Sequence, residues 1–306
     1  MRRRSKNLDQ ARKIRLADYV VKEVSKFGLK TNIYSIIVRG FLNSVVLDLD
    51  GKFQVYPDIR KELKRRTLED LFTFYSREAT IALHNLFKTQ SNDIKELLKD
   101  ASIWIKSIYE ASCSLFDIVY LFNLETNTRL IINTKSPYMP LEIGIGWHPY
   151  FNLPYIPASA LKGIVRYYFE THKIKVCGLD SSILFGETSR EGILIFYDAL
   201  PTSYKDALIE PDVITPHYPE VEGKIDELFV SPRPLVYPTV APGVRFSTIL
   251  AVNLSYINNI DLKSLINELK DHVATALSLG IGARVSLGYG FVKVCLMNIG
   301  GKKVRI

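Results

Sequence analysis

The sequence has few cysteines and no long apolar segment. Its three cysteines, Cys113, Cys177 and Cys295, lie far apart and form no Cys-x-x-Cys or Cys/His ligand spacing, which favours free thiols over a disulfide framework or a metal site. No apolar run reaches the roughly 18 residues of a membrane span. The basic N-terminus lacks the uncharged segment of a secretory signal. We therefore expect a cytoplasmic protein that does not contact the membrane.

Signatures of common enzymes are also missing. The sequence contains no Gly-x-Ser-x-Gly elbow and no His-Glu-x-x-His pair, and its five histidines are scattered. His217 could serve as a general acid or base in RNA cleavage, but a lone histidine beside tyrosine and proline is more often structural. We expect no catalytic residue, no metal and no cofactor.

Proline is scarce in the first part of the chain. Residues 1–136 contain only Pro57, whereas eight of the 14 prolines lie between Pro201 and Pro242, where we expect them to interrupt regular structure in a long excursion at about 200–242. This contrast predicts two regions, 1–127 and 128–306. Hydrophobic residues at 47% and charged residues at 24% are typical of a globular protein.

Positive charge is concentrated at the N-terminus. The net charge is +8, and the first 15 residues carry seven Lys or Arg against Asp9. Such an arm suits a polyanion, because basic side chains that bind phosphates release counterions, but a solvated tail has the same composition. Both interpretations remain open.

The first region is predicted to be mainly helical. Apolar residues recur at helical spacing over 17–27, 68–86 and 94–108, the last after Ser91. Within 46–56, Asp50-Gly51 separates two short apolar runs, as in a two-residue hairpin turn.

The second region alternates between strand and helix patterns. Strands are expected at 129–133, 192–198, 244–253 and 290–296, and helices at 158–172 and 262–279. The resulting order, βαββαβ, predicts an α+β fold of the ferredoxin-like or RRM-like type, which hosts many functions.

Three segments could bind nucleic acid. The loop 280–290 holds Gly280, Gly282, Gly288 and Gly290 around Arg284. Because it follows a helix and contains no Gly-Lys-Ser/Thr, we exclude a mononucleotide site. The glycines suit either contact with a phosphate backbone or a tight helix-to-strand turn. In 155–166, Lys162 and Arg166 share a helix face near its start, which suits a phosphate or a solvated stripe. Residues 212–218 lie in the excursion, whose aromatic residues could stack on bases or pack on their own domain.

These segments carry a family resemblance. Ile156-Pro-Ala-Ser-Ala-Leu-Lys-Gly163, Leu184-Phe-Gly186, Asp212-Val-Ile-Thr-Pro-His-Tyr218 and the glycine-rich loop resemble the RAMP superfamily of CRISPR-associated proteins over about 128–297. Within it, the sequence is most similar to the family formed by the sixth subunit of the Cmr (type III-B) effector complex.

The resemblance implies a non-catalytic RNA-binding backbone subunit that holds guide RNA near its 3′ end, with guide RNA, target RNA and other Cmr RAMP subunits as partners. It implies an RRM-like RAMP domain. The implied RNA-binding residues are Lys162, Arg166, His217, Tyr218, Arg233, Gly280, Gly282, Arg284, Gly288, Tyr289 and Gly290. The alternatives are a metal-independent RAMP endoribonuclease that processes precursor RNA with His217 or His172, and an assembly subunit that contacts no RNA.

Overall fold

The computed structural model describes residues 29, 31–47, 53–55, 68–89, 91–135, 139–215, 234–257 and 259–304. The basic arm, the helix expected at 17–27, and His217, Tyr218 and Arg233 lie outside these residues. The chain divides into two compact units. The first comprises Met1–Gln90, Ser136–Gly144 and Pro211–Pro238, and the second comprises Ser91–Lys135, Ile145–Glu210 and Thr239–Ile306. This division differs from the expected one at 127/128, because residues 91–127 belong to the second unit and residues 136–144 and 211–238 belong to the first.

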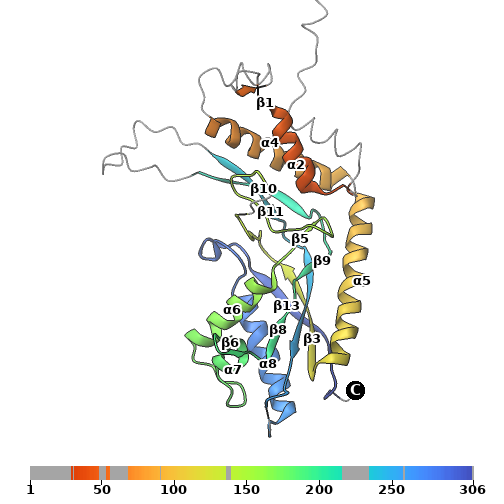
Figure 1. Ribbon diagram of the computed structural model, residues 1–306, viewed down its shortest axis with the longest axis vertical. Helices are drawn as coiled ribbons and strands as arrows, with labels where there is room; N and C mark the ends of the chain where they lie inside the picture. Colours follow the sequence, from red (N-terminus) through yellow and green to blue (C-terminus); the bar gives the residue numbers. More distant parts are fainter. Residues whose placement is uncertain are drawn as a thin grey trace, which may run out of the picture. The chain divides into compact units, whose positions relative to one another are not determined.

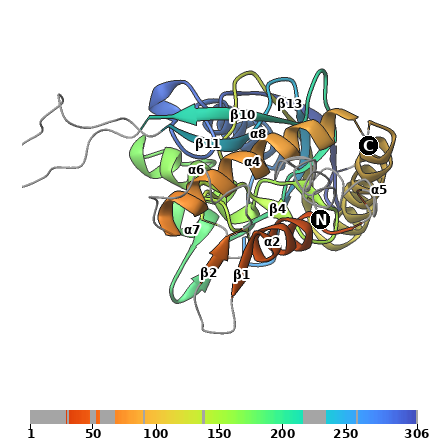
Figure 2. The same ribbon diagram turned by 90° about the horizontal axis from the view of Figure 1, so that it is seen from above.

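The described residues of the first unit include two helices and a short hairpin. Helices α2 (Ile33–Ser44) and α4 (Leu68–Thr89) are present, and β1 (Val45–Leu47) pairs antiparallel with β2 (Phe53–Val55). Figure 2 shows this hairpin beside α2. The helix expected over 68–86 and the hairpin are confirmed, whereas α2 was not expected.

The second unit is built on an antiparallel sheet with the order β13-β3-β12-β8, in which β9 also pairs with β12. The strands are β3 (Ile118–Thr126), β8 (Leu194–Phe196), β9 (Leu200–Ser203), β12 (Arg245–Val252) and β13 (Val292–Gly300). The expected strands near 192, 244 and 290 are confirmed with shifted ends. Mixed helix and strand content with an antiparallel sheet confirms the α+β class.

The strand expected at 129–133 is wrong. Only Leu130 forms a bridge, to Val240, and the strand that precedes α6 in the sheet is β3. The carbonyls of Arg129 and Ile131 instead accept hydrogen bonds from Gly290 and Ala283, in the glycine-rich loop. This segment therefore supports a loop rather than extending the sheet.

Helices cover both faces of this sheet. Helices α6 (Ala158–Thr171) and α8 (Leu262–Ser278) lie on one face, and α5 (Ser91–Leu115) lies along the other (Figure 1). All three were expected as helices. Alternate residues of β3 point to opposite faces, so Tyr120 reaches the carbonyl of Ile266 in α8 at 3.1 Å. On the other face, Ser112 of α5 donates to Tyr197 at 3.1 Å.

The proline-rich excursion contains more regular structure than expected. Its described parts include β9, β10 (Ile209–Ile214) and β11 (Leu235–Val240), and β10 pairs with β11 in a two-stranded sheet. Pro201, Pro211 and Pro238 lie within these strands. Proline is tolerated at strand positions whose N–H is not needed, as on the outer side of a two-stranded sheet.

Short elements complete the described fold. They are β4 (Trp147–His148) with β5 (Leu153–Pro154), α7 (Ser181–Phe185), β6 (Gly186–Glu187) with β7 (Arg190–Glu191), and the 3-10 turn η1 (Val285–Leu287). Among the helices that the structure describes, none has the length and apolar content to cross a bilayer.

Candidate nucleic-acid interface

The glycine-rich loop owes much of its glycine to the packing of its own chain. Gly282 has φ +86° and Gly290 has φ +75°, and a Cβ at these positions would overlap the carbonyl oxygens of Ile131 and Ile281, respectively. Gly280 has φ +128° and faces the side chain of Val285. The fold thus requires glycine at these three positions whether or not a phosphate approaches. Their presence no longer distinguishes the two interpretations of the loop.

Arg284 is the exposed charge at the centre of this loop. Its backbone adopts the left-handed conformation, with φ 62° and ψ 30°, which costs a residue with a Cβ roughly 1–2 kcal/mol. Its carbonyl accepts hydrogen bonds from Leu287 at 2.9 Å and from Tyr289 at 3.4 Å. Within the part of the chain that the structure describes, Arg284 forms no ion pair. Its guanidinium is therefore available to a ligand.

The rest of the loop tip is also exposed. Gly288 has φ +91° with open space around it, and the side chain of Leu287 is 67% exposed. Tyr289 is only partly exposed. The loop therefore offers one cation and an apolar side chain to solvent.

A series of backbone hydrogen bonds connects the loop to the start of α6. Gly290 donates to Arg129, Gly146 donates to Ile132, and Tyr155 donates to Gly146, at 2.8 to 3.1 Å. Because Tyr155 lies only two residues before the Pro157 cap of α6, the loop and the helix start lie at the same end of the second unit (Figure 1). The structure thus brings the two segments that carry Lys162 and Arg284 to one end of the second unit.

The first amide of α6 already has an anionic partner. The N–H of Ala158 donates to the carboxylate of Asp198 at 2.6 Å. This carboxylate occupies the position where a negative charge gains most from the helix dipole. A phosphate would have to displace it or bind to the side chains further along the helix.

The two cations of α6 differ in their partners. The Nε of Arg166 lies 2.7 Å from the Glu170 carboxylate, one turn away, and this hydrogen bond lowers the pKa of Glu170. Lys162 is partly buried and has no ion-pair partner among the described residues. Lys162 is therefore the less compensated charge.

Two residues beside this face were missed in the sequence. Tyr167 is 72% exposed although it is aromatic, and Gly163 is exposed in the helix interior. Both lie on a face of α6 that adjoins the face of Lys162 and Arg166. The spacing of Gly163 and Tyr167, four residues apart, was the available signal.

The sheet face beneath α5 differs from an RNA-binding platform of the RRM type, which stacks bases on aromatic side chains. The aromatic residues of β3, Tyr120 and Phe122, are buried on the α8 side, and burial raises the pKa of Tyr120.

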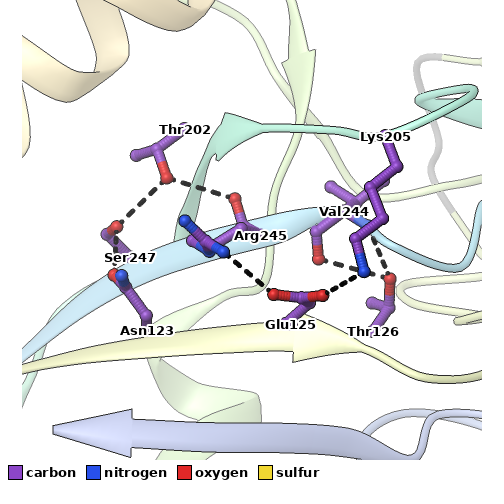
Figure 3. Close-up of polar contacts among 8 residues, drawn as sticks. All are labelled: Asn123, Glu125, Thr126, Thr202, Lys205, Val244, Arg245 and Ser247. Atoms are coloured by element: carbon purple, nitrogen blue, oxygen red, sulfur yellow. Dashed lines mark hydrogen bonds and ion pairs between the residues drawn. The ribbon is translucent and has the colours of Figure 1, made fainter.

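The face of the sheet that α5 covers carries a polar cluster instead of aromatic rings (Figure 3). Glu125 accepts contacts from Lys205 at 2.7 Å and Arg245 at 3.0 Å. The hydrogen bond from Lys205, followed by that from Arg245, lowers the pKa of Glu125. Ser247 donates to Asn123 at 2.7 Å. The cations of this face are thus partly neutralised.

An open groove of about 450 Å³ lies between α5 and this face. Its lining combines Ile105, Tyr109 and Leu121 with Thr202 and Ser247. Its lining also includes Lys106, whose Nζ lies 3.8 Å from the Glu110 carboxylate, so this cation has an acidic partner.

Comparisons with known proteins place the chain in a family. Residues 123–293 match the RAMP superfamily, and the chain belongs to this superfamily. It is 30% identical over 243 residues to CRISPR system CMR subunit Cmr6 of Saccharolobus solfataricus, covering 79% of this chain and 78% of that protein. The resemblance read from the sequence motifs is confirmed.

Solved structures are also similar. The fold matches a chain in the cryo-EM structure of the type III-B Cmr-beta bound to cognate target RNA, with a TM-score of 0.61 and 28% identity, covering 93% of this chain and 96% of that chain. The crystal structure of Cmr6 from Pyrococcus furiosus is matched with a TM-score of 0.34 and 21% identity, over 57% of this chain and 96% of that chain.

Proposed function

We propose that this protein is a non-catalytic RNA-binding backbone subunit of a type III-B (Cmr) effector complex. In this role it holds guide RNA near its 3′ end in the cytoplasm, together with other Cmr RAMP subunits and target RNA. Similarity to Cmr6 and to a chain of an RNA-bound Cmr complex supports this proposal. The observation that carries it is the placement of Lys162 and Arg284 on segments joined at one end of the sheet, where neither cation has an ion-pair partner among the described residues.

We assign the second unit to the ferredoxin-like type. Along the chain its strands follow as β3, β8, β12 and β13, and in the sheet they lie in the order β13-β3-β12-β8, with all neighbours antiparallel. Helix α6 follows β3 and α8 follows β12. This is the arrangement expected of a βαββαβ fold.

Charge reversal tests RNA binding. Lys162→Glu and Arg284→Glu should each weaken retention of guide RNA by the purified complex, and the salt dependence of single-strand binding should fall by a slope of roughly 0.7 per lost phosphate contact. Lys99→Glu, an equal charge change at an exposed position of α5, is the matched control. If both variants retained RNA as well as the wild type, the assembly-only alternative would replace the proposal.

Incubation with repeat-containing RNA in EDTA tests the absence of catalysis. His172 Nδ1 lies 2.9 Å from the Tyr168 carbonyl of its own helix, an arrangement that suits a structural role. We expect no cleavage by the wild-type chain. Cleavage that disappeared in His172→Ala or His217→Ala would establish the endoribonuclease instead.

A further inference from the structure

Strand β13 forms one edge of the sheet in the second unit. It pairs with β3 on one side, and the described residues place no strand on its other side. The carbonyl of Phe291 accepts a hydrogen bond from Asn127, just beyond the end of β3. Because successive residues of an antiparallel strand direct their N–H and C=O groups to alternate sides, those of Val292, Val294 and Leu296 point away from β3. None of these outward groups has a backbone partner among the described residues.

This edge has little of the protection that exposed edges usually carry. Proteins protect an edge with a short strand, a proline or a bulge. At the opposite edge, β8 and β9 have three and four residues, whereas β13 has nine and contains no proline. The pairing of β13 shifts once, between Leu296 and Asn298. Residues 292–296, before this shift, therefore form a regular template for a further strand.

The charge beside this edge indicates the chemistry of such a strand. Lys293 is exposed and has no ion-pair partner among the described residues. Glu125 lies directly across from it on β3 but is held by Lys205 and Arg245. An acidic side chain on an added strand, opposite Lys293, would supply the missing partner. β13 itself contains no acidic residue, so the same strand of a second copy offers no such charge.

An apolar side chain of an added strand also has a surface to cover. The groove between α5 and the sheet is lined by Asn298 of β13 together with Ile105, Tyr109 and Leu121. Met297, the chain neighbour of Asn298, is 57% exposed. Neighbouring strands lie about 4.8 Å apart, so a large apolar side chain at one end of an added strand is within reach of this surface.

We propose that an extended segment of a neighbouring protein subunit adds as a strand to the free edge of β13 at residues 292–296. Its backbone pairs with the outward N–H and C=O groups, an acidic residue lies opposite Lys293, and an apolar residue covers Met297. This proposal rests on the proposed function, because the partner is another subunit of the effector complex. A protein strand is favoured over RNA, because it matches the alternating N–H and C=O groups of the edge.

Hydrogen exchange at single-residue resolution tests this pairing. In the isolated full chain, the amides of Val292, Val294 and Leu296 should exchange quickly, and in the reconstituted complex their exchange should slow roughly tenfold or more. The amides of Lys293 and Cys295 face β3 and should be protected in both states, which makes them the internal reference. If the outward amides gained no protection in a complex that assembled and held RNA, the proposal would be wrong and the proposed function would stand.

Two substitutions test the partner's backbone and charge separately. Val294→Pro removes an outward N–H but no hydrogen bond to β3, and proline is tolerated at such positions of an edge strand. It should abolish co-purification of one subunit, and Lys293→Glu should weaken the affinity for that subunit roughly tenfold. Both should keep the RNA affinity of the wild type. Val294→Thr, which retains the N–H, and Lys263→Glu, at an exposed position of α8, are the matched controls. If Val294→Pro does not fold, Lys293→Glu and the exchange measurement decide.

Other outcomes would assign the edge to a different occupant and overturn the proposal. Protection of residues 292–296 upon addition of RNA alone would identify nucleic acid as the occupant. Protection that increased with the concentration of the isolated chain would identify a second copy. A wild-type chain that joined no other subunit and held no RNA would refute the proposed function itself.

Discussion

Replacing Arg284 by glycine relieves backbone strain but also removes a positive charge. We therefore expect stability to rise and RNA binding to weaken. The left-handed conformation of Arg284 (φ 62°) costs roughly 1–2 kcal/mol, which glycine does not incur. The greater conformational freedom of glycine in the unfolded chain offsets about 0.5–1 kcal/mol of this gain in stability. Arg284→Gly should therefore stabilise the protein by about 0.5–1 kcal/mol, a rise of about 1–3 °C in melting temperature.

The same substitution should weaken RNA binding, because it removes a cation that has no ion-pair partner among the described residues. Calorimetry of the full chain would measure stability, and fluorescence anisotropy at several salt concentrations would measure the slope of affinity, which should fall by roughly 0.7. Arg284→Lys keeps both the charge and the strain and should resemble the wild type. A lower melting temperature for Arg284→Gly would refute the strain argument, and an unchanged salt slope would refute the phosphate contact.

Three further changes test the loop, a turn and a helix cap. Gly282→Ala should destabilise the chain by several kcal/mol in denaturant titration, because its Cβ would overlap the Ile131 carbonyl at a positive φ. Burial lowers the pKa of His148 below its ordinary value of 6.5, although the charge of Asp198 acts in the opposite direction. The unfolded chain therefore binds more protons than the folded chain, and stability should fall as the pH drops below 6.5. In pH-dependent melting, His148→Gln should show a shallower decline. Asp198→Ala should cost about 1 kcal/mol in chemical unfolding, because the Ala158 amide loses its partner at the start of α6.

Helices with one apolar face could be predicted from the sequence with nearly correct ends. In α6 and α8, buried residues such as Leu161, Val165 and Leu269 recur at helical spacing. Strand β12 was found because prolines and asparagine bound a long apolar run. These patterns are local, because the spacing of apolar residues within one segment is enough to predict its secondary structure.

Strand β3 was missed because both of its faces are covered. Its sequence, IVYLFNLET, shows little alternation between apolar and polar residues, since α8 packs on one side and α5 on the other. It also follows α5 after only Phe116 and Asp117. The separation of a long helix from an adjoining strand depended on tertiary contacts that no local pattern contains.

The role of the glycines could not be decided from the sequence for a related reason. The sequence shows where a Cβ is missing but not which atoms lie opposite. At Gly282 and Gly290 these atoms belong to the chain itself, whereas at Gly163 a Cβ would meet no neighbouring atom of the described residues within 4 Å. The dense glycine cluster was therefore the more conspicuous signal, and the isolated helical glycine is the one that the fold leaves unexplained.

The arrangement of the second unit also limits which surface the proposed RNA binding could use. An RRM-like order of elements by itself suggests the open sheet face, where aromatic residues would stack on bases. Here α5 lies along that face, the ring of Tyr120 is turned toward α8, and the carboxylate of Glu125 lies between Lys205 and Arg245. Lys162 and Arg284, which have no ion-pair partner in the described part of the chain, instead lie on the segments that meet at one end of the sheet. RNA contacts at this end require no displacement of α5, and their strength should depend on phosphate charge rather than base identity.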